Sequence, residues 1–215
     1  EQTLTVNGRE IPATQNGWQL LRTNASLPMT LSSSMPWQIG FINIERPGRG
    51  VTVSAMGING AQLSQWSKWR PGMWEDLAQT KADLIILAYG TNEAFSGNLD
   101  ISSTERTWRN YIRQIKNTLP NAGILILGAP ESLKTAYGSC GNRPVLLSEV
   151  QQMQQRVARD EKIMFWSWQD AMGGACSMKN WMAQGLAAKD GVHFSAQGYE
   201  TAADKLADSL IHFAQ

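Results

Sequence analysis

Continuous apolar runs alternate with amphipathic stretches along the chain from residue 82 to its end. The apolar runs have the length and composition of strands covered on both faces, and they occupy residues 82–89, 123–128 and 163–168. The amphipathic stretches place apolar residues at helical spacing, and they occupy residues 103–119, 145–157 and 196–213. Regular alternation of strands and helices predicts an α/β fold with parallel strands and right-handed crossovers.

The chain before residue 82 has a different character. An earlier strand is predicted at residues 51–56, and a helical segment interrupted by Pro71-Gly72 is predicted at residues 62–77. In the first 48 residues, short apolar runs are broken by Asn-Gly, Gly and Pro, which predicts antiparallel β structure with turns. We therefore expect a boundary near residues 47–50 and interpret residues 1–48 as part of a β module or an insertion.

Composition narrows the possible partners. A chain of 215 residues suits one domain, or one domain with a small appendage. The net charge is +1 and there is no long basic run, so the sequence does not indicate binding to nucleic acid or to an anionic membrane. No apolar stretch approaches the ~20 residues that a membrane-spanning helix needs. The nine tryptophans are interpreted first as core residues and second as flat surfaces for sugar rings.

The two cysteines, Cys140 and Cys176, lie in separate glycine-rich loops. Two cysteines and two histidines far apart in the sequence provide no ligand cluster, so no metal site is predicted. A disulfide between Cys140 and Cys176 would join the two loops and would fit an oxidising compartment. Two unrelated free thiols are the alternative.

Three polar segments follow predicted strands at the carboxyl edge of the expected sheet. They are residues 57–60 (Gly-Ile-Asn-Gly), 90–93 (Gly-Thr-Asn-Glu) and 190–193 (Asp-Gly-Val-His). Open parallel sheets bind ligands outside the carboxyl ends of their strands. The sequence therefore predicts one site at this edge.

His193 is the best candidate for a general base. The only other histidine, His212, lies in the closing helix, where a structural role fits better. A histidine base needs an acceptor on its second ring nitrogen to fix the tautomer, and Asp190 can supply that carboxylate from three residues away. The alternative is that Asp190 only caps a turn.

Asn92 is a candidate donor to an oxyanion. A side-chain amide at the carboxyl end of a strand can stabilise negative charge that forms on a substrate carbonyl. A glycine N–H from residues 57–60 could add a second donor, and both Gly57 and Gly60 are candidates. Ordinary turns at both places are the alternative.

Taken in this order, residues 57–60, 90–93 and 190–193 resemble the conserved blocks of the SGNH (GDSL-type) hydrolases. The resemblance extends from about residue 51 to residue 213. It implies a three-layer, flavodoxin-like parallel sheet and an ester hydrolase without a cofactor. It also implies that His193 is the base, that Asp190 orients it, and that Gly60 and Asn92 form the oxyanion hole.

Within that family, the same segments look like those of the bacterial peptidoglycan O-acetylesterases. That group inserts a carbohydrate-binding-like β module before its glycine block, and residues 1–48 resemble the end of such an insert. Residues 49–215 would then be the hydrolase core. The resemblance implies a periplasmic or otherwise exported enzyme that removes acetyl groups from the 6-hydroxyl of N-acetylmuramic acid.

The nucleophile block of the family, Gly-Asp-Ser, does not occur in this sequence. Ser132 follows a predicted strand but lacks the flanking glycines of a nucleophile elbow, and Ser34, Ser54 and Ser139 lack a strand-turn-helix setting. We therefore expect the serine outside this chain, on a first strand that the core lacks. A fragment carrying that strand is an expected partner, and the chain alone is expected to be inactive or poorly stable.

Two other functions fit parts of the sequence. One is a non-catalytic glycan-binding protein that uses exposed tryptophans such as Trp66, Trp69 and Trp74, with a vestigial hydrolase site. The other is an esterase for another acetylated sugar or a lipid. Residues 137–143 and 173–181 form polar, glycine-rich loops with aromatic side chains, which suits a sugar ester better than a lipid.

Overall fold

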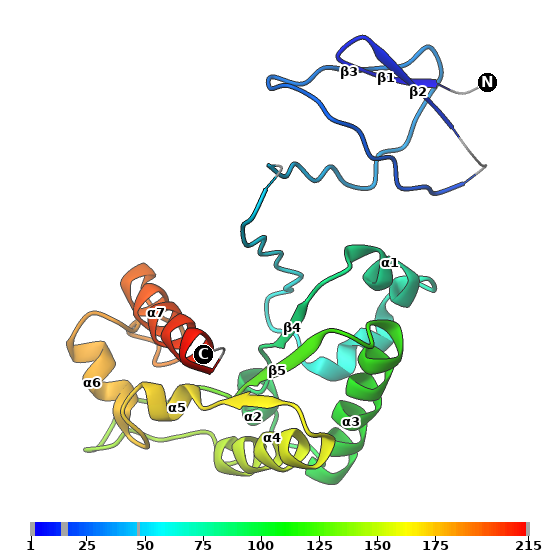
Figure 1. Cartoon of the computed structure of the whole chain (residues 1–215). Coiled ribbons are helices and arrows are strands. Elements are labelled where there is room, and N and C mark those ends of the chain that lie inside the picture. The colour runs from blue at the N-terminus through cyan, green and yellow to red at the C-terminus, as the bar shows by residue number, and fades with distance from the viewer. Residues whose placement is uncertain (1–2, 14–16, 47, 214–215) are drawn as a thin grey trace. The chain divides into compact units, whose positions relative to one another are not determined.

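The computed structural model describes residues 3–13, 17–46 and 48–213 and divides into two compact units, residues 1–55 and 56–215 (Figure 1). The division falls after Ala55, later in the chain than the boundary expected near residues 47–50. Pro47 itself lies outside the described residues. The assignment of residues 1–48 to a β module stays a prediction.

The first unit contains the antiparallel strands that its turn-rich sequence predicts. Strand β1 (Thr3–Val6) lies between β2 (Arg9–Pro12) and β3 (Leu31–Ser32). Asn7 and Gly8 connect β1 to β2 with φ of 48° and 80°. Positive φ at both residues is the geometry that an Asn-Gly pair favours in a two-residue hairpin. The apolar runs at residues 18–21 and 38–44 form no strand.

The second unit is built on the predicted parallel sheet. Its strands β4 (Leu84–Leu87), β5 (Gly123–Leu127) and β6 (Met164–Trp166) pair in the order β4-β5-β6. Among the described residues, β4 therefore has a ladder partner on one side only. The α/β fold with parallel strands is confirmed.

Helices connect and cover these strands. The helices are η1 (Leu63–Lys68), α1 (Met73–Thr80), α2 (Thr91–Phe95), α3 (Ile101–Thr118), α4 (Leu147–Glu161), α5 (Trp168–Ala171), α6 (Ser177–Ala183) and α7 (Ala196–Phe213). Pro71 and Gly72 separate η1 from α1, as the sequence predicts. Asp100 begins α3 by accepting hydrogen bonds from the backbone N–H groups of Ser102 and Ser103. Figure 1 shows α7 across the sheet from α3 and α4.

The main core lies between the sheet and the pair α3 and α4. Trp108, Ile112 and Ile115 of α3 are fully buried and pack with Leu87 of β4 and Ile126 of β5. Burying each such side chain stabilises the fold by about 1.5–3 kcal/mol. This face of the sheet is therefore well covered, and it fixes the strand ends that lead into the expected site.

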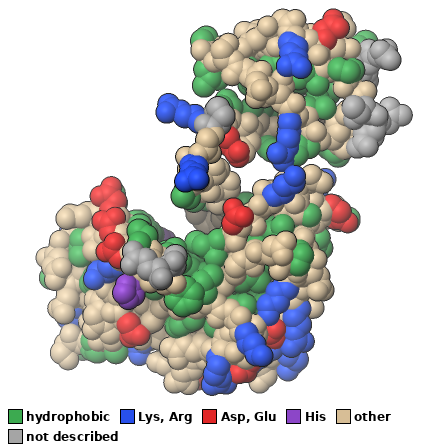
Figure 2. Space-filling model, viewed as in Figure 1, with side chains coloured by type: hydrophobic (Ala, Val, Ile, Leu, Met, Phe, Trp, Pro, Cys, Tyr) green, Lys and Arg blue, Asp and Glu red, His purple; other side chains and the backbone are tan. Residues whose placement is uncertain are grey.

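The opposite side of the unit is less well covered. Helix α7 has the predicted bounds, but its expected apolar face is only partly covered, with Tyr199 47% and Phe213 78% exposed. Ile86 of the edge strand β4 is 42% exposed. Figure 2 shows hydrophobic side chains gathered on the visible face of this unit.

The strand predicted at residues 51–56 is wrong. These residues form no ladder, and Val51 and Val53 are 91% and 87% exposed. Alternation of apolar and polar residues creates a strand only when a neighbouring backbone pairs with it and another layer covers its apolar side. Neither condition is met for residues 51–56.

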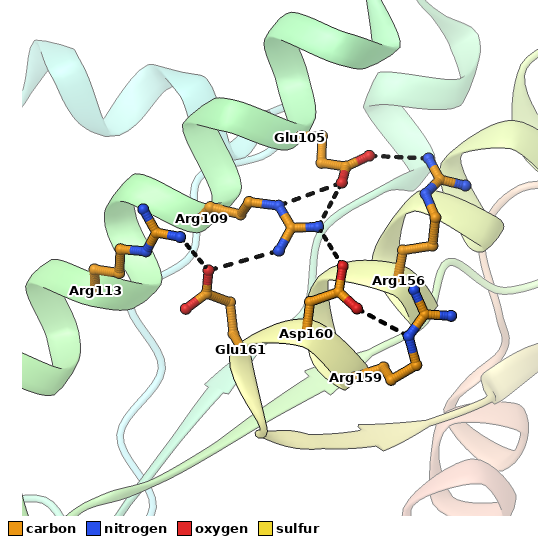
Figure 3. Close-up of polar contacts among 7 residues, drawn as sticks. All are labelled: Glu105, Arg109, Arg113, Arg156, Arg159, Asp160 and Glu161. Carbon is orange, nitrogen blue, oxygen red and sulfur yellow. Dashed lines mark hydrogen bonds and ion pairs between the residues drawn. The ribbon is translucent and has the colours of Figure 1, made fainter.

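A network of ion pairs joins α3 to α4 (Figure 3). The Arg109 guanidinium lies 2.6 Å from a Glu105 carboxylate oxygen, 2.9 Å from one of Asp160 and 3.6 Å from one of Glu161. Glu161 is buried, and Arg113 also pairs with it at 2.9 Å. Burial opposes ionisation of Glu105, but hydrogen bonds from Arg109 and Arg156 outweigh that effect and lower the pKa of its carboxyl group.

Arg109→Met is expected to lower the free energy of unfolding by about 1–3 kcal/mol, because the half-buried Glu105 loses a hydrogen-bond donor and the buried Glu161 loses a nearby cation. Urea unfolding at pH 7 measures this loss. Arg159→Met is the matched control: its side chain is 71% exposed, so its pair with Asp160 contributes within about 0.5 kcal/mol.

The same comparison has a pH dependence. Because the folded-state pKa of Glu105 is lowered, its contribution is present above its unfolded pKa of about 4.3 and disappears as the pH falls through the folded value. The difference between the parent and Arg109→Met should therefore shrink below about pH 4. An equal effect of both substitutions at pH 7 would show that the network does not stabilise the fold.

Candidate active site

His193 and Asp190 form the hydrogen-bonded pair that the sequence predicts. The Asp190 Oδ2 atom lies 2.7 Å from His193 Nδ1. The other carboxylate oxygen accepts hydrogen bonds from the backbone N–H groups of Val192 at 2.9 Å and His193 at 3.0 Å. These backbone bonds, together with the imidazole, lower the pKa of Asp190 to about 2. A fixed carboxylate on Nδ1 leaves Nε2 as the nitrogen that can accept a proton.

The turn that carries this pair is fastened to the segment after β5. Gly191 has a φ of 71°, which favours glycine, and its carbonyl accepts the Leu133 N–H at 2.8 Å. A Cβ at Gly191 would come within 3.0 Å of the Leu133 side chain. The Ala188 N–H donates to the His193 carbonyl at 2.8 Å and closes the turn before α7.

Asn92 follows the carboxyl end of β4 and lies beside the loop that contains Gly57 and Gly60. Its side-chain amide donates to the Ala61 carbonyl at 2.9 Å, and the Gln62 side chain donates to the Asn92 carbonyl at 3.3 Å. Gly60 precedes Ala61 directly and has a φ of 76°. An amide nitrogen carries two protons, so one can hold the loop while the other is offered to a substrate oxygen. The structure therefore brings Asn92 and the loop of Gly60 together.

Glu93 is a site residue that the sequence reasoning missed. Its carboxylate is buried and accepts the backbone N–H groups of Leu63 and Gly90, each at 2.9 Å. Burial raises the pKa of Glu93, and the backbone hydrogen bonds act in the opposite direction. The carboxylate thus ties the segment after the glycine loop to the segment that carries Asn92. The sequence does contain an indication of this role, because Glu93 stands three positions after Gly90, where helices commonly place a capping Glu.

Two glutamines of α4 hold the ends of the neighbouring strands. Gln154 is fully buried, accepts the Ala129 N–H at 2.8 Å and donates to the Tyr89 carbonyl at 2.7 Å. Gln151 donates to the Ala129 carbonyl at 2.8 Å. A Cβ at Gly90 would come within 2.7 Å of the Gln154 side-chain nitrogen, so this close approach requires glycine.

A buried ion pair supports the segment between β5 and the Leu133 contact. Glu131 is fully buried, and its carboxylate lies 2.5 Å from Arg143 Nε and 2.5 Å from the Gln169 side-chain nitrogen. Arg143 also donates to the Ser148 hydroxyl at 3.1 Å. This pair links the strand end to α4 and α5 and thereby steadies the segment that holds Gly191.

No serine of the described residues completes a triad. None of their hydroxyl groups hydrogen-bonds to the His193 ring. Ser132 is fully buried after β5, which prevents attack on an external ester. Ser33 belongs to the first unit and donates to the Thr3 carbonyl at 2.9 Å.

The two cysteines are joined in a disulfide, with their Cα atoms 4.8 Å apart. It connects the loop after β5 to the start of α6. Among residues 3–13, 17–46 and 48–213, no cluster of His, Cys, Asp and Glu could hold a metal ion.

Trp66, Trp69 and Trp74 are not the exposed set that a glycan-binding protein would present. Trp66 is buried, stacks on Trp69 with ring centroids 4.9 Å apart, and donates to the Tyr89 hydroxyl at 2.9 Å. Trp69 and Trp74 are partly buried and pack against the main core. The expectation that these rings are exposed is wrong, because Trp69 and Trp74 both pack against the buried Trp66.

Comparison with known proteins agrees with this geometry. Residues 33–201 match the model of the GDSL-like lipase/acylhydrolase family. The chain belongs to this family. The SGNH hydrolase fold predicted from its sequence blocks is confirmed, whereas an inserted carbohydrate-binding module stays a prediction.

Several solved structures of this family resemble the chain. A structure named as a peptidoglycan O-acetylesterase is 67% identical with a TM-score of 0.92, and the match covers 99% of this chain and 61% of that one. The chain therefore spans about three fifths of that protein's length. The acetyl xylan esterase AlAXEase is 16% identical with a TM-score of 0.56 over 71% of this chain and 78% of that one.

An acetylxylan esterase from Geobacillus stearothermophilus, Axe2, is 17% identical with a TM-score of 0.50, over 67% of this chain and 65% of that one. At such identities, the comparison with the two acetyl xylan esterases shows only that they share a fold with this chain. A search of curated proteins finds no match.

Proposed function

We propose that this chain is the main part of a carbohydrate esterase that removes acetyl groups from peptidoglycan, at the 6-hydroxyl of N-acetylmuramic acid. The Asp190–His193 pair carries the proposal, because its 2.7 Å hydrogen bond provides an oriented base that a purely structural turn does not need. The 67% identity to a peptidoglycan O-acetylesterase supports this substrate.

The proposed reaction uses a serine from outside this chain. His193 Nε2 takes the serine proton as the hydroxyl oxygen attacks the acetyl carbonyl. The Asn92 amide and the Gly60 N–H stabilise the resulting oxyanion. His193 then gives the proton to the sugar oxygen, which leaves as a free hydroxyl group. Water, activated by His193, releases acetate from the acyl-serine and restores the serine.

Two features support a serine-bearing strand that is added to this chain. The strand β4 has one ladder partner among the described residues, and its Ile86 side chain is 42% exposed. The apolar side chains of Ile211 and Phe213 on α7 are also exposed. A further strand with an apolar side would satisfy the backbone of β4 and cover such surface. We therefore expect this chain alone to be inactive or poorly stable.

The cell envelope is the proposed place of action, and residues 1–48 are proposed to be part of an inserted carbohydrate-binding-like module. The Cys140–Cys176 disulfide supports a periplasmic or other exported location, because disulfides persist in oxidising compartments. Within the described residues, no helix is both long enough and apolar enough to span a bilayer.

Intact mass spectrometry of the purified protein, before and after treatment with a serine-directed fluorophosphonate, tests the proposal. A second polypeptide that copurifies with this chain and takes up the label would supply the nucleophile. A single unlabelled species of 215 residues that nevertheless hydrolyses acetylated peptidoglycan would refute it. Glycan binding that survives both Asn92→Ala and His193→Ala, without hydrolysis, would instead favour a non-catalytic binding protein.

A further inference from the structure

The side chain of Tyr137 is unusually open for an aromatic residue in an ordered loop. It lies between β5 and α4 and is 85% exposed. Among the described residues, its side chain has no hydrogen bond, ion pair or ring contact. Packing therefore does not explain why an aromatic ring is placed here.

The loop that presents Tyr137 is held in place at several points. Lys134 donates to the Asn142 carbonyl at 2.7 Å, and the Asn142 N–H donates to the Thr135 carbonyl at 2.8 Å. The Asn142 side chain adds a bond to the Thr135 hydroxyl at 2.9 Å. The Cys140–Cys176 disulfide and a hydrogen bond from Lys179 to the Gly138 carbonyl tie the tip of the loop to α6. An exposed ring on such a support binds at a low cost in conformational entropy.

The same loop starts beside the turn that carries Asp190 and His193. Leu133 donates to the Gly191 carbonyl at 2.8 Å, and Gly191 lies between Asp190 and His193. Tyr137 lies four positions after Leu133, so their Cα atoms are at most about 14 Å apart. Tyr137 thus lies on a loop that begins next to the Asp190–His193 turn, and a glycan chain whose acetyl group lies at His193 can extend over this loop.

We propose that Tyr137 is a specificity-determining residue that stacks on a sugar ring of the glycan chain near the acetylated sugar. This inference rests on the proposed esterase function. A tyrosine ring offers a flat apolar face to the C–H side of a sugar and a hydroxyl group to its polar rim. Because the ring holds the chain and does not touch the ester, it favours acetyl groups on a polymer over small acetate esters.

The test compares two substrates in the whole esterase, meaning this chain together with the segment that supplies the serine. The substrates are O-acetylated peptidoglycan fragments and 4-nitrophenyl acetate. Tyr137→Ala is expected to raise KM for the glycan about 3- to 10-fold, as expected for the loss of one ring-stacking contact, with kcat nearly unchanged. Its rate on 4-nitrophenyl acetate should equal that of the parent.

Two variants sharpen the result. Tyr137→Phe keeps the ring and should retain a KM within about twofold of the parent, since stacking needs the ring face. Val145→Ala is the matched control, because Val145 is 82% exposed in the same connection between β5 and α4 and should change neither substrate. Unchanged glycan kinetics in Tyr137→Ala, or an equal loss on both esters, would overturn the inference. A parent protein that cannot hydrolyse the glycan, or His193→Ala with full activity, would instead refute the proposed function.

Discussion

In the whole esterase, His193→Ala is expected to lower kcat by about 10⁵- to 10⁶-fold, the loss seen when a triad histidine is removed. The chain offers no second histidine for this role, because His212, the only other one in the sequence, lies at the end of α7. Hydrolysis of acetylated peptidoglycan, followed as acetate release, measures the effect. Retention of more than a hundredth of the parent kcat would show that another group takes the serine proton.

Asp190→Asn tests the orienting role separately. The amide keeps the size of the carboxylate but stabilises the wrong tautomer of His193, so kcat should fall about 10⁴-fold. Asp204→Asn provides the control, since Asp204 is an exposed carboxylate on α7 away from the pair. If both aspartate variants retain full activity, the 2.7 Å contact between Asp190 and His193 has no catalytic function.

The low pKa of Asp190, about 2, fixes the shape of the acid limb of the rate profile. A folded-state pKa below the unfolded value of about 3.9 means that the interaction is present above pH 4 and is lost as the pH falls through about 2. Asp190 therefore stays ionised throughout the working range. As the pH is lowered toward about 4, log(kcat/KM) should fall by no more than one unit per pH unit. A fall of two units per pH unit would show that Asp190 also takes up a proton in this range.

The sequence predicted the elements whose pattern is local. The helix at residues 196–213 has the predicted bounds, and the parallel strands lie where continuous apolar runs predict them. The Asp190–His193 contact was also predictable, because a short turn brings residues three positions apart together. In each case the information lies within one stretch of chain.

Features that depend on distant partners were not predictable. Residues 51–56 have a strand-like pattern, but no described backbone pairs with them. Gln154 is a polar residue within an amphipathic helix, and only the packing of α4 against the ends of β4 and β5 gives it two buried partners. Glu93 likewise depends on Leu63, thirty residues earlier in the chain. The roles of Gln154 and Glu93 become clear only when the folded chain brings their backbone partners next to them.

Asn92→Ala, which removes the proposed oxyanion donor, is expected to lower kcat by about 10²- to 10³-fold with little change in KM. The amide contributes mainly when the carbonyl oxygen becomes an oxyanion, so its loss raises the barrier without weakening substrate binding. Steady-state kinetics on acetylated peptidoglycan with the whole esterase measure both constants. Gln62→Ala is the control in the same loop: Gln62 donates to the Asn92 backbone carbonyl and should change kcat less than about threefold, since it is no oxyanion donor.

Asn92 also holds the Ala61 carbonyl at 2.9 Å, so a loosened loop must be separated from a lost oxyanion donor. Glu93→Gln makes that separation. It keeps the Asn92 amide but turns one of the two oxygens that hold Leu63 and Gly90 into a donor, which should cost about 1–3 kcal/mol of stability. If Asn92 is an oxyanion donor, Asn92→Ala lowers kcat more than Glu93→Gln but destabilises the protein less. If kcat in both variants falls only in proportion to stability, Asn92 supports the loop and takes no part in the chemistry.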